Sequence, residues 1–194
     1  MGIRRLLGRH ASGDVMSAKI LVASLGSKFS ELIETDNSTY RHLNLSPTNA
    51  VFKSIDELFA AIAKRYDVVH LFCDVSHDGT LSDIEGKKTS GTTLIQKCFE
   101  SGVKLLWLAA NNEPEGYITG FKLAAGTAMN LVLTIDRRGS RFSSFLAELL
   151  LKMSHGESMP LAWVSLAPQS SKDPRNQEAP SCIYVAGRSA PRLR

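Results

Sequence analysis

The chain has 194 residues, the usual size of one folded domain, and its 43% hydrophobic and 22% charged content is that of a globular protein, which excludes a disordered chain. The formal net charge of +4 lies at the two ends, because residues 1–15 carry a net +2 and residues 188–194 carry +3, so we do not expect nucleic acid as a partner. No apolar run approaches the roughly 18 residues of a membrane helix and the N-terminus lacks the apolar core of a secretion signal, so we expect no membrane contact and a cytoplasmic location.

One domain is expected between two short tails. We predict flexible basic tails at residues 1–17 and 188–194, and a single α/β domain over residues 18–187. The cysteines are odd in number, widely spaced and set in apolar segments, so we expect packing residues in a reducing compartment and no disulfide framework. These cysteines are Cys73, Cys98 and Cys182.

Apolar runs of strand length alternate with amphipathic segments along this domain. The predicted strands are Lys19–Leu25, Tyr66–Cys73, Val103–Ala110, Asn130–Ile135 and Ser181–Ala186, with Asn44–Phe52 as a strand or an extended link. The predicted helices are Ser54–Arg65 with its N-cap at Ser54, Thr92–Ser101, Tyr117–Ala125 and Ser140–Ser154. The predicted loops are Asp74–Gly91 and Ser165–Ala179. This alternation predicts a three-layer α/β fold, with a mostly parallel central sheet and helices on both faces.

Polar loops follow two of the predicted strands, and in parallel sheets sites collect at the edge where the strands end. The loop after Tyr66–Cys73 brings His77 together with the candidate site-lining residues Asp74, Ser76, Asp78 and Gly79. The loop after Val103–Ala110 supplies Asn111, Asn112 and Glu113. Both loops share one edge if the two strands are neighbours. His70, inside its strand, is expected to be buried and hydrogen-bonded.

These segments resemble the caspase-like peptidase fold, in particular bacterial CHAT-type domains. In that family a histidine follows one strand in an H-x-G context, similar to His77, Asp78 and Gly79 here. A cysteine follows the next strand in a context like L-S-A-C-N-S-G, where this chain reads LAANN over residues 108–112. Gly126, Asp136 and the closing IYVAG of residues 183–187 resemble later segments of the family, so the resemblance extends over residues 18–187.

The chain departs from the resembling family at the nucleophile. Asn111 stands where the family has its cysteine, and Ala110 takes that place if the alignment shifts by one residue. An amide cannot attack a carbonyl carbon as a thiolate does. We therefore expect a catalytically inactive, CHAT-like interaction or regulatory module with a protein or peptide partner, in which His77 is a remnant base.

Two other functions stay open on the sequence. The first is a cysteine or serine hydrolase in which His77 works with Cys73 or Ser76 as a non-standard nucleophile. The second is a TIR-like or flavodoxin-like signalling module that binds a nucleotide at the same edge. In that case a phosphate loop should follow the first strand, where Gly26 and Ser27 provide few glycines.

No metal or cofactor is expected. The sequence contains no GxGxxG, P-loop or HExxH motif. Acidic residues are frequent in the two site loops, but without ligand spacing they are better interpreted as a solvated rim. The acidic residues considered are Asp74, Asp78, Asp83, Glu85, Glu113 and Glu115.

Overall fold

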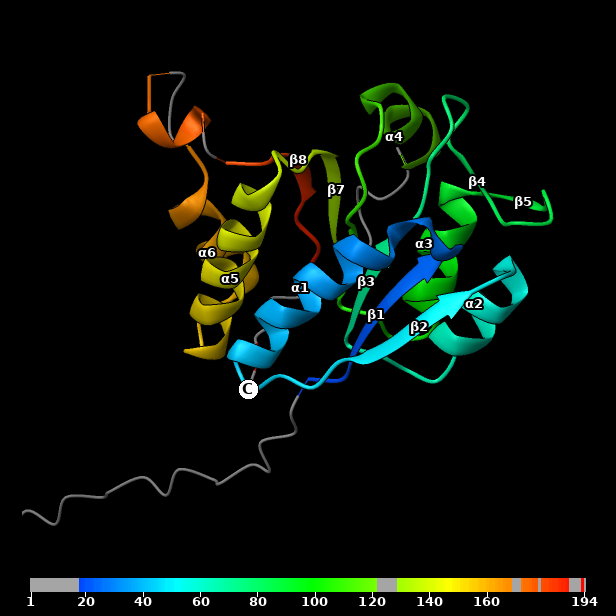
Figure 1. The fold of residues 1–194 in the computed structure, drawn as a ribbon, viewed down its shortest axis with the longest axis horizontal. Coiled ribbons are helices and arrows are strands. Elements are labelled where there is room, and N and C mark those ends of the chain that lie inside the picture. The colour runs from blue at the N-terminus through cyan, green and yellow to red at the C-terminus, as the bar shows by residue number, and fades with distance from the viewer. Residues whose placement is uncertain (1–17, 122–128, 169–171, 178, 189–192, 194) are drawn as a thin grey trace, which may run out of the picture.

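A six-stranded sheet forms the centre of the computed structural model, which describes residues 18–121, 129–168, 172–177, 179–188 and 193 (Figure 1). Five neighbouring strands are parallel, and the last strand is antiparallel to its neighbour. The strands in spatial order are β2 (Thr48–Phe52), β1 (Ile20–Leu25), β3 (Val68–Phe72), β6 (Leu105–Leu108), β7 (Asn130–Asp136) and β8 (Ser181–Val185). The predicted mostly parallel sheet is confirmed, and Asn44–Phe52 contains a strand rather than a link.

Helices cover both faces of this sheet, so the fold has the three layers predicted from the sequence (Figure 1). One face is covered by α2 (Ile55–Ile62), α3 (Gly91–Glu100) and α4 (Pro114–Phe121). The other face is covered by α1 (Ser30–His42), α5 (Ser140–Ser154) and α6 (Met159–Leu166). Two short 3₁₀ helices are η1 (Ser27–Phe29) and η3 (Pro174–Gln177).

Strand residues alternate between the two helical layers, as the pleat of a strand requires. In β3, Val69 and Leu71 pack toward α2 and α3, whereas Val68, His70 and Phe72 face α1 and α5. All five residues are buried, which explains why the strand reads as a continuous apolar run with one histidine. The central strands are therefore buried on both faces, and polar function is restricted to the loops at the ends.

Local signals set several helix boundaries as expected. The Ser54 side chain accepts a hydrogen bond from the N–H of Glu57, and the Glu57 carboxylate accepts one from the N–H of Ser54, forming a capping box at α2. Gly102, with φ of 78°, follows the end of α3, as a glycine predicted at a helix C-terminus should.

Two α-helices and a two-stranded hairpin were not predicted. The helix α1 lies in a stretch without a sequence assignment, and α6 begins before the predicted loop Ser165–Ala179 and ends inside it at Leu166. The predicted loop Asp74–Gly91 contains a small antiparallel hairpin of β4 (Thr80–Ser82) and β5 (Lys88–Ser90). Strands of three residues are too short to show a periodic pattern.

The predicted tails fall largely outside the described residues. Residues 1–17 lie outside them, as do Gly126 and the end of the predicted helix Tyr117–Ala125. In the predicted C-terminal tail, Leu193 is described, and it is buried with its N–H donating to the carbonyl of Met153. Leu193 is therefore not part of a loose tail, because its side chain packs into the apolar layer formed with α5 and α6.

Candidate functional site

The two predicted site loops lie at the same edge of the sheet. Strands β3 and β6 are parallel neighbours, with Leu71 of β3 in register with Leu108 of β6. The loop that begins at Asp74 and the loop that begins at Asn111 therefore leave adjacent strands in the same direction. The two strands are neighbours, so both loops share one edge of the sheet, as expected from the sequence in that case.

Asn112 ties these two loops together with a half-buried side chain. Its Oδ1 accepts a hydrogen bond from the N–H of Val75 at 2.6 Å. Its Nδ2 donates to the carbonyl of Cys73 at 3.1 Å and to the hydroxyl of Tyr117 at 2.9 Å. One amide side chain thus holds Val75 and Cys73, which lie 37 and 39 positions earlier in the chain. Asn112, predicted to line the site, has a structural role at its base.

His77 lies at the tip of a tight turn after β3. The turn closes where the N–H of Gly79 donates to the carbonyl of Ser76 at 2.8 Å. The Asp78 carboxylate accepts hydrogen bonds from the Ser76 hydroxyl and from the Thr80 hydroxyl and N–H. These bonds, led by the one from Ser76, lower the pKa of Asp78 to about 2. His77 is exposed, and among the described residues it has no hydrogen-bond or ion-pair partner.

Two glycines of α4 bring that helix into direct contact with the turn. A Cβ on Gly120 would lie 2.4 Å from the carbonyl oxygen of Gly79, and a Cβ on Gly116 would lie 2.5 Å from that of Ser76. Gly79 itself has a φ of 77°, which favours glycine. The spacing of four residues places both helical glycines on one face. This G-x-x-x-G spacing was the available sequence signal, and the sequence interpretation did not use it.

Asn111 is exposed in the loop that follows β6. Its Oδ1 accepts a hydrogen bond from the N–H of Arg137, the first residue after β7, at 2.9 Å. This bond links the loop after β6 to the loop after β7. Ala110, the residue before it, is buried at 1% exposure and cannot present chemistry to solvent.

The candidate sulfur nucleophile has an apolar environment. Cys73 is 1% exposed, and burial raises the pKa of its thiol above the ordinary value. Burial likewise raises the pKa of both Cys98 and Cys182 to about 12. All three thiols are free, and the expectation that they are packing residues is confirmed by their burial, complete for two and partial for Cys182.

Ser76 has its hydroxyl engaged within its own turn. The hydroxyl donates to Asp78 at 2.6 Å and lies 2.8 Å from both the carbonyl and the hydroxyl of Thr80. A serine nucleophile requires a base within hydrogen-bond reach of its oxygen. The groups hydrogen-bonded to the Ser76 hydroxyl belong to Asp78 and Thr80, not to His77.

A buried polar cluster lies beneath this edge, between α1 and the sheet. Arg137 donates two hydrogen bonds to the Asp36 carboxylate, at 2.7 and 3.1 Å, and one to the carbonyl of Ala109. His70 hydrogen-bonds with the Tyr40 hydroxyl at 2.9 Å through Nδ1. Its Nε2 lies 3.1 Å from Asp36 Oδ2, an ion-pair distance without hydrogen-bond geometry. The prediction that His70 is buried and hydrogen-bonded is confirmed.

The Asp36 carboxylate lies between two basic side chains of this cluster, those of His70 and Arg137. Burial by itself raises the pKa of Asp36, but His70 and Arg137 outweigh it and hold that pKa below its ordinary value. The Arg137 guanidinium also lies 3.7 Å from the centre of the Phe142 ring. Arg137 therefore connects Asn111 at the surface, through its N–H, to Asp36 in the core, through its side chain. Sequence reasoning missed Asp36, Tyr40 and Arg137.

The acidic residues of the loops form separate contacts. Asp74 pairs with Lys28 of η1, the 3₁₀ helix that follows β1. Asp83 accepts hydrogen bonds from the N–H groups of Ile55, Glu85 and Lys87 and so fastens the hairpin to α2. Among the described residues, no group of three or more histidine, cysteine, aspartate or glutamate side chains is arranged to hold a metal ion. The same part of the chain contains no helix with the length and apolar character needed to cross a bilayer.

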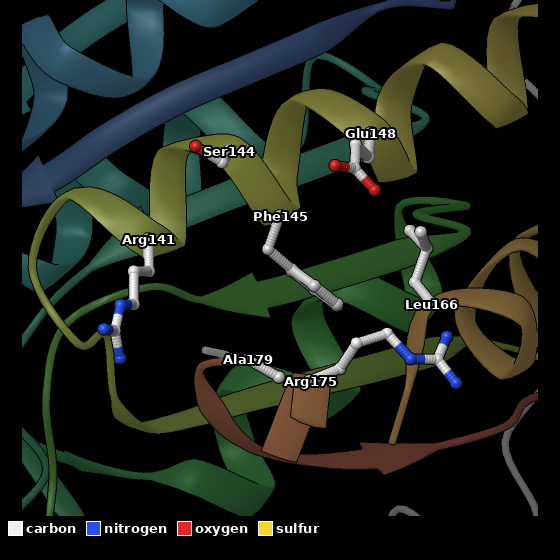
Figure 2. A pocket seen from close by; sticks show the side chains of 7 residues that line it. All are labelled: Arg141, Ser144, Phe145, Glu148, Leu166, Arg175 and Ala179. Atoms are coloured by element: carbon white, nitrogen blue, oxygen red, sulfur yellow. The ribbon is translucent and has the colours of Figure 1, made fainter. Parts of the chain in front are cut away.

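A pocket lies at a different place, beside α5. It has a volume of about 350 Å³, is open to solvent, and is lined by α5, the end of α6 and the segment before β8 (Figure 2). Its lining residues are Arg141, Ser144, Phe145, Glu148, Leu166, Arg175 and Ala179. Neither predicted site loop contributes to it.

No family model, curated protein or solved structure matches this chain.

Proposed function

We propose that this chain is a catalytically inactive, caspase-like domain similar to CHAT domains, and that it acts as an interaction or regulatory module. The observation that carries the proposal is Asn111, exposed at the end of β6 and beside the strand whose loop holds His77. The resembling peptidases have a cysteine at that place, and an amide cannot form the thioester intermediate. The Asn111 oxygen is moreover engaged by the N–H of Arg137.

The neighbouring residues give little support to a replacement nucleophile. Cys73 is enclosed in the core, where burial keeps the thiol protonated, and a thiol is a far weaker nucleophile than a thiolate. The Ser76 hydroxyl donates to a carboxylate of its own turn. A hydrolase that uses His77 with either residue would need the turn after β3 to rearrange, and the contact between Gly79 and Gly120 resists that movement.

A flavodoxin-like signalling module is the second candidate, because the parallel strands follow its order. The order β2-β1-β3-β6-β7 matches the 2-1-3-4-5 arrangement, in which ligands bind where the order reverses, between β1 and β3. In this chain the loops after β1 and β3 are joined there by the ion pair of Lys28 with Asp74. A phosphate bound here would have to displace the Asp74 carboxylate from Lys28, and the two negative charges would repel each other. We therefore rank nucleotide binding below the inactive peptidase-like domain.

The position of Asn111 can be tested by placing a thiol there. In Asn111→Cys, a histidine within reach should favour the thiolate, so the pH dependence of iodoacetamide alkylation should shift below the ordinary thiol pKa of about 8.5. The shift should disappear in the double variant with His77→Ala. We expect alkylation at pH 6.5 to be at least about tenfold faster with His77 than without it, which corresponds to a pKa difference of about one unit.

Glu113→Cys provides the matched control, because Glu113 is exposed on the same loop two residues further on. Its alkylation should follow an ordinary thiol and should not respond to His77→Ala. If Asn111→Cys behaves like Glu113→Cys, then Asn111 does not face His77, and the peptidase-like interpretation of this edge is wrong.

A further inference from the structure

The pocket beside α5 has the size and the walls of a ligand site. Its volume of about 350 Å³ lies at the lower end of the roughly 300 to 1,000 Å³ of small-molecule pockets. Figure 2 shows the side chains of α5 along one wall, with Leu166 of α6, Arg175 and Ala179 opposite. The two walls therefore run along the direction of α5.

Arginine side chains hold the wall opposite α5 in place. Arg138, just before α5, and Arg141, in its first turn, donate to the carbonyls of Asn176 and Gln177 in η3, on the wall opposite α5. Arg175 donates to the carbonyl of Ser165 at the end of α6 and pairs with Asp173. These three hydrogen bonds fix η3 against α5 and α6 and thus shape the pocket. The Asp173 carboxylate neutralises the charge of Arg175.

The centre of the pocket is apolar. It is formed by Phe145, Leu166 and Ala179. The Phe145 ring packs edge-on against Trp163 of α6, with centroids 5.3 Å apart and planes at 84°, which fixes the ring. An apolar side chain of a ligand would find a preformed surface here and would lose little free energy to rearrangement of the protein.

Charges of opposite sign stand at the two ends of this apolar centre. One guanidinium nitrogen of Arg141 donates to the carbonyl of Gln177, and the other guanidinium donors have no partner among the described residues. Within the same described part of the chain, the Glu148 carboxylate has no hydrogen bond or ion pair. Arg141 and Glu148 lie seven positions apart on α5, which is roughly 10 Å along the axis at 1.5 Å per residue. Figure 2 shows them at opposite ends of the wall.

We propose that this pocket binds an extended peptide segment of a partner protein, with an acidic side chain next to Arg141, an apolar side chain on Phe145, and a basic side chain next to Glu148. An extended chain advances about 3.3 Å per residue and alternates its side chains between two faces, so the acidic, apolar and basic residues stand at positions i, i+2 and i+4. The long side chains of Arg141 and Glu148 can reach outward to the ends of this segment, which spans roughly 13 Å. This binding site does not depend on the proposed inactive edge, because it shares no lining residue with the loops of His77 and Asn111.

Fluorescence polarisation with short labelled peptides tests this proposal. The probes are acetyl-Gly-Asp-Gly-Leu-Gly-Lys-Gly-amide and its reversed sequence, which cover both chain directions, and two peptides in which both charged positions are Lys or both are Asp. The wild-type protein should bind one of the two mixed-charge probes at least about fivefold more tightly than either uniform probe. Equal binding of all four, or of none, would overturn the proposal.

Charge reversals then identify the two ends. Glu148→Arg removes no contact of the described structure and should shift the preference to the Asp/Asp probe, by about fivefold or more. Arg141→Glu should shift the preference to the Lys/Lys probe. Glu31→Arg, an exposed glutamate on α1, is the matched control and should leave all four affinities unchanged. His77→Ala should also leave them unchanged, and if Glu148→Arg leaves the order of the probes unaltered, the proposed pocket is not the binding site.

Discussion

Replacing Asp36 by asparagine tests the buried cluster under the site edge. The substitution keeps the shape of the side chain but removes the negative charge that faces Arg137, whose guanidinium is 5% exposed and donates to both carboxylate oxygens. Breaking a buried ion pair by removing one partner typically costs about 3 to 5 kcal/mol, because the other charge stays buried and unpaired. Part of the Arg137 hydrogen bonding survives through the amide oxygen of the substituted side chain and the Ala109 carbonyl, so we expect a loss of about 3 kcal/mol.

The pH dependence gives this prediction a definite sign. The folded pKa of Asp36 is lowered, so its contribution to the free energy of unfolding is fully present above the unfolded pKa of about 3.9. That contribution is lost as the pH falls from about 4 toward the folded pKa. Asp36→Asn should therefore be less stable than wild type near neutral pH, and the difference should shrink below pH 4.

Urea unfolding followed by circular dichroism measures both quantities. Asp56→Asn is the control, because Asp56 pairs with Lys87 at the surface with a side chain that is 74% exposed, and such pairs contribute about 1 kcal/mol or less. If Asp36→Asn costs no more than Asp56→Asn at pH 7, the cluster does not depend on a buried ion pair and the argument is refuted.

Three further predictions concern the loops and the core. Asn112→Ala should lower the free energy of unfolding by about 2 to 3 kcal/mol, because it leaves buried groups of two loops without partners. Asn111→Ala, which removes one hydrogen bond, should lower it by only about 1 kcal/mol, and urea unfolding compares the two variants. Gly120→Ala should destabilise by about 2 kcal/mol although alanine favours helix, because its Cβ would meet the carbonyl oxygen of Gly79 at 2.4 Å; an unchanged melting temperature would contradict this. Cys98, whose pKa burial raises to about 12, should react with iodoacetamide at pH 8 at least about 100-fold more slowly in the native protein than in urea, as mass spectrometry can measure.

The layers of the fold were predictable because the central strands are buried on both faces. Continuous apolar runs such as the one ending at Phe72 cannot be exposed, and their alternation with amphipathic helices leaves few alternatives to a parallel sheet. The site edge followed from the same reasoning, since consecutive strands joined by a helix end at the same side. His77 and Asn111 were placed there by position in the chain, without any information about their contacts.

The helix α1 was missed because its buried face mixes polar residues with apolar ones. Asp36, Asn37 and Thr39 are buried in it and interrupt the apolar pattern on which helix prediction depends. Asp36 is buried because Arg137 compensates it, and the two residues are 101 positions apart in the chain. No local pattern reveals a partner at that distance, so the helix and the cluster become visible together only in three dimensions.

The helix α6 was missed for the opposite reason. Its sequence, MPLAWVSL, is apolar on all sides and shows no polar stripe to define a helical period. Leu161 and Val164 are correspondingly exposed on the helix, at 66% and 59%. The pocket beside α5 depends on this helix and on the segment before β8, so no pattern in the sequence predicted it.

Hydrolysis of peptides by the unmodified protein tests the central claim most directly. The protein is incubated with a proteome-derived peptide library, and new peptide termini are quantified by mass spectrometry against a heat-denatured sample. The absence of a nucleophile at Asn111 predicts no termini above that background, in the wild type or in His77→Ala. Cleavage at defined sequences that is present in the wild type and lost in His77→Ala would contradict the account and establish an active hydrolase.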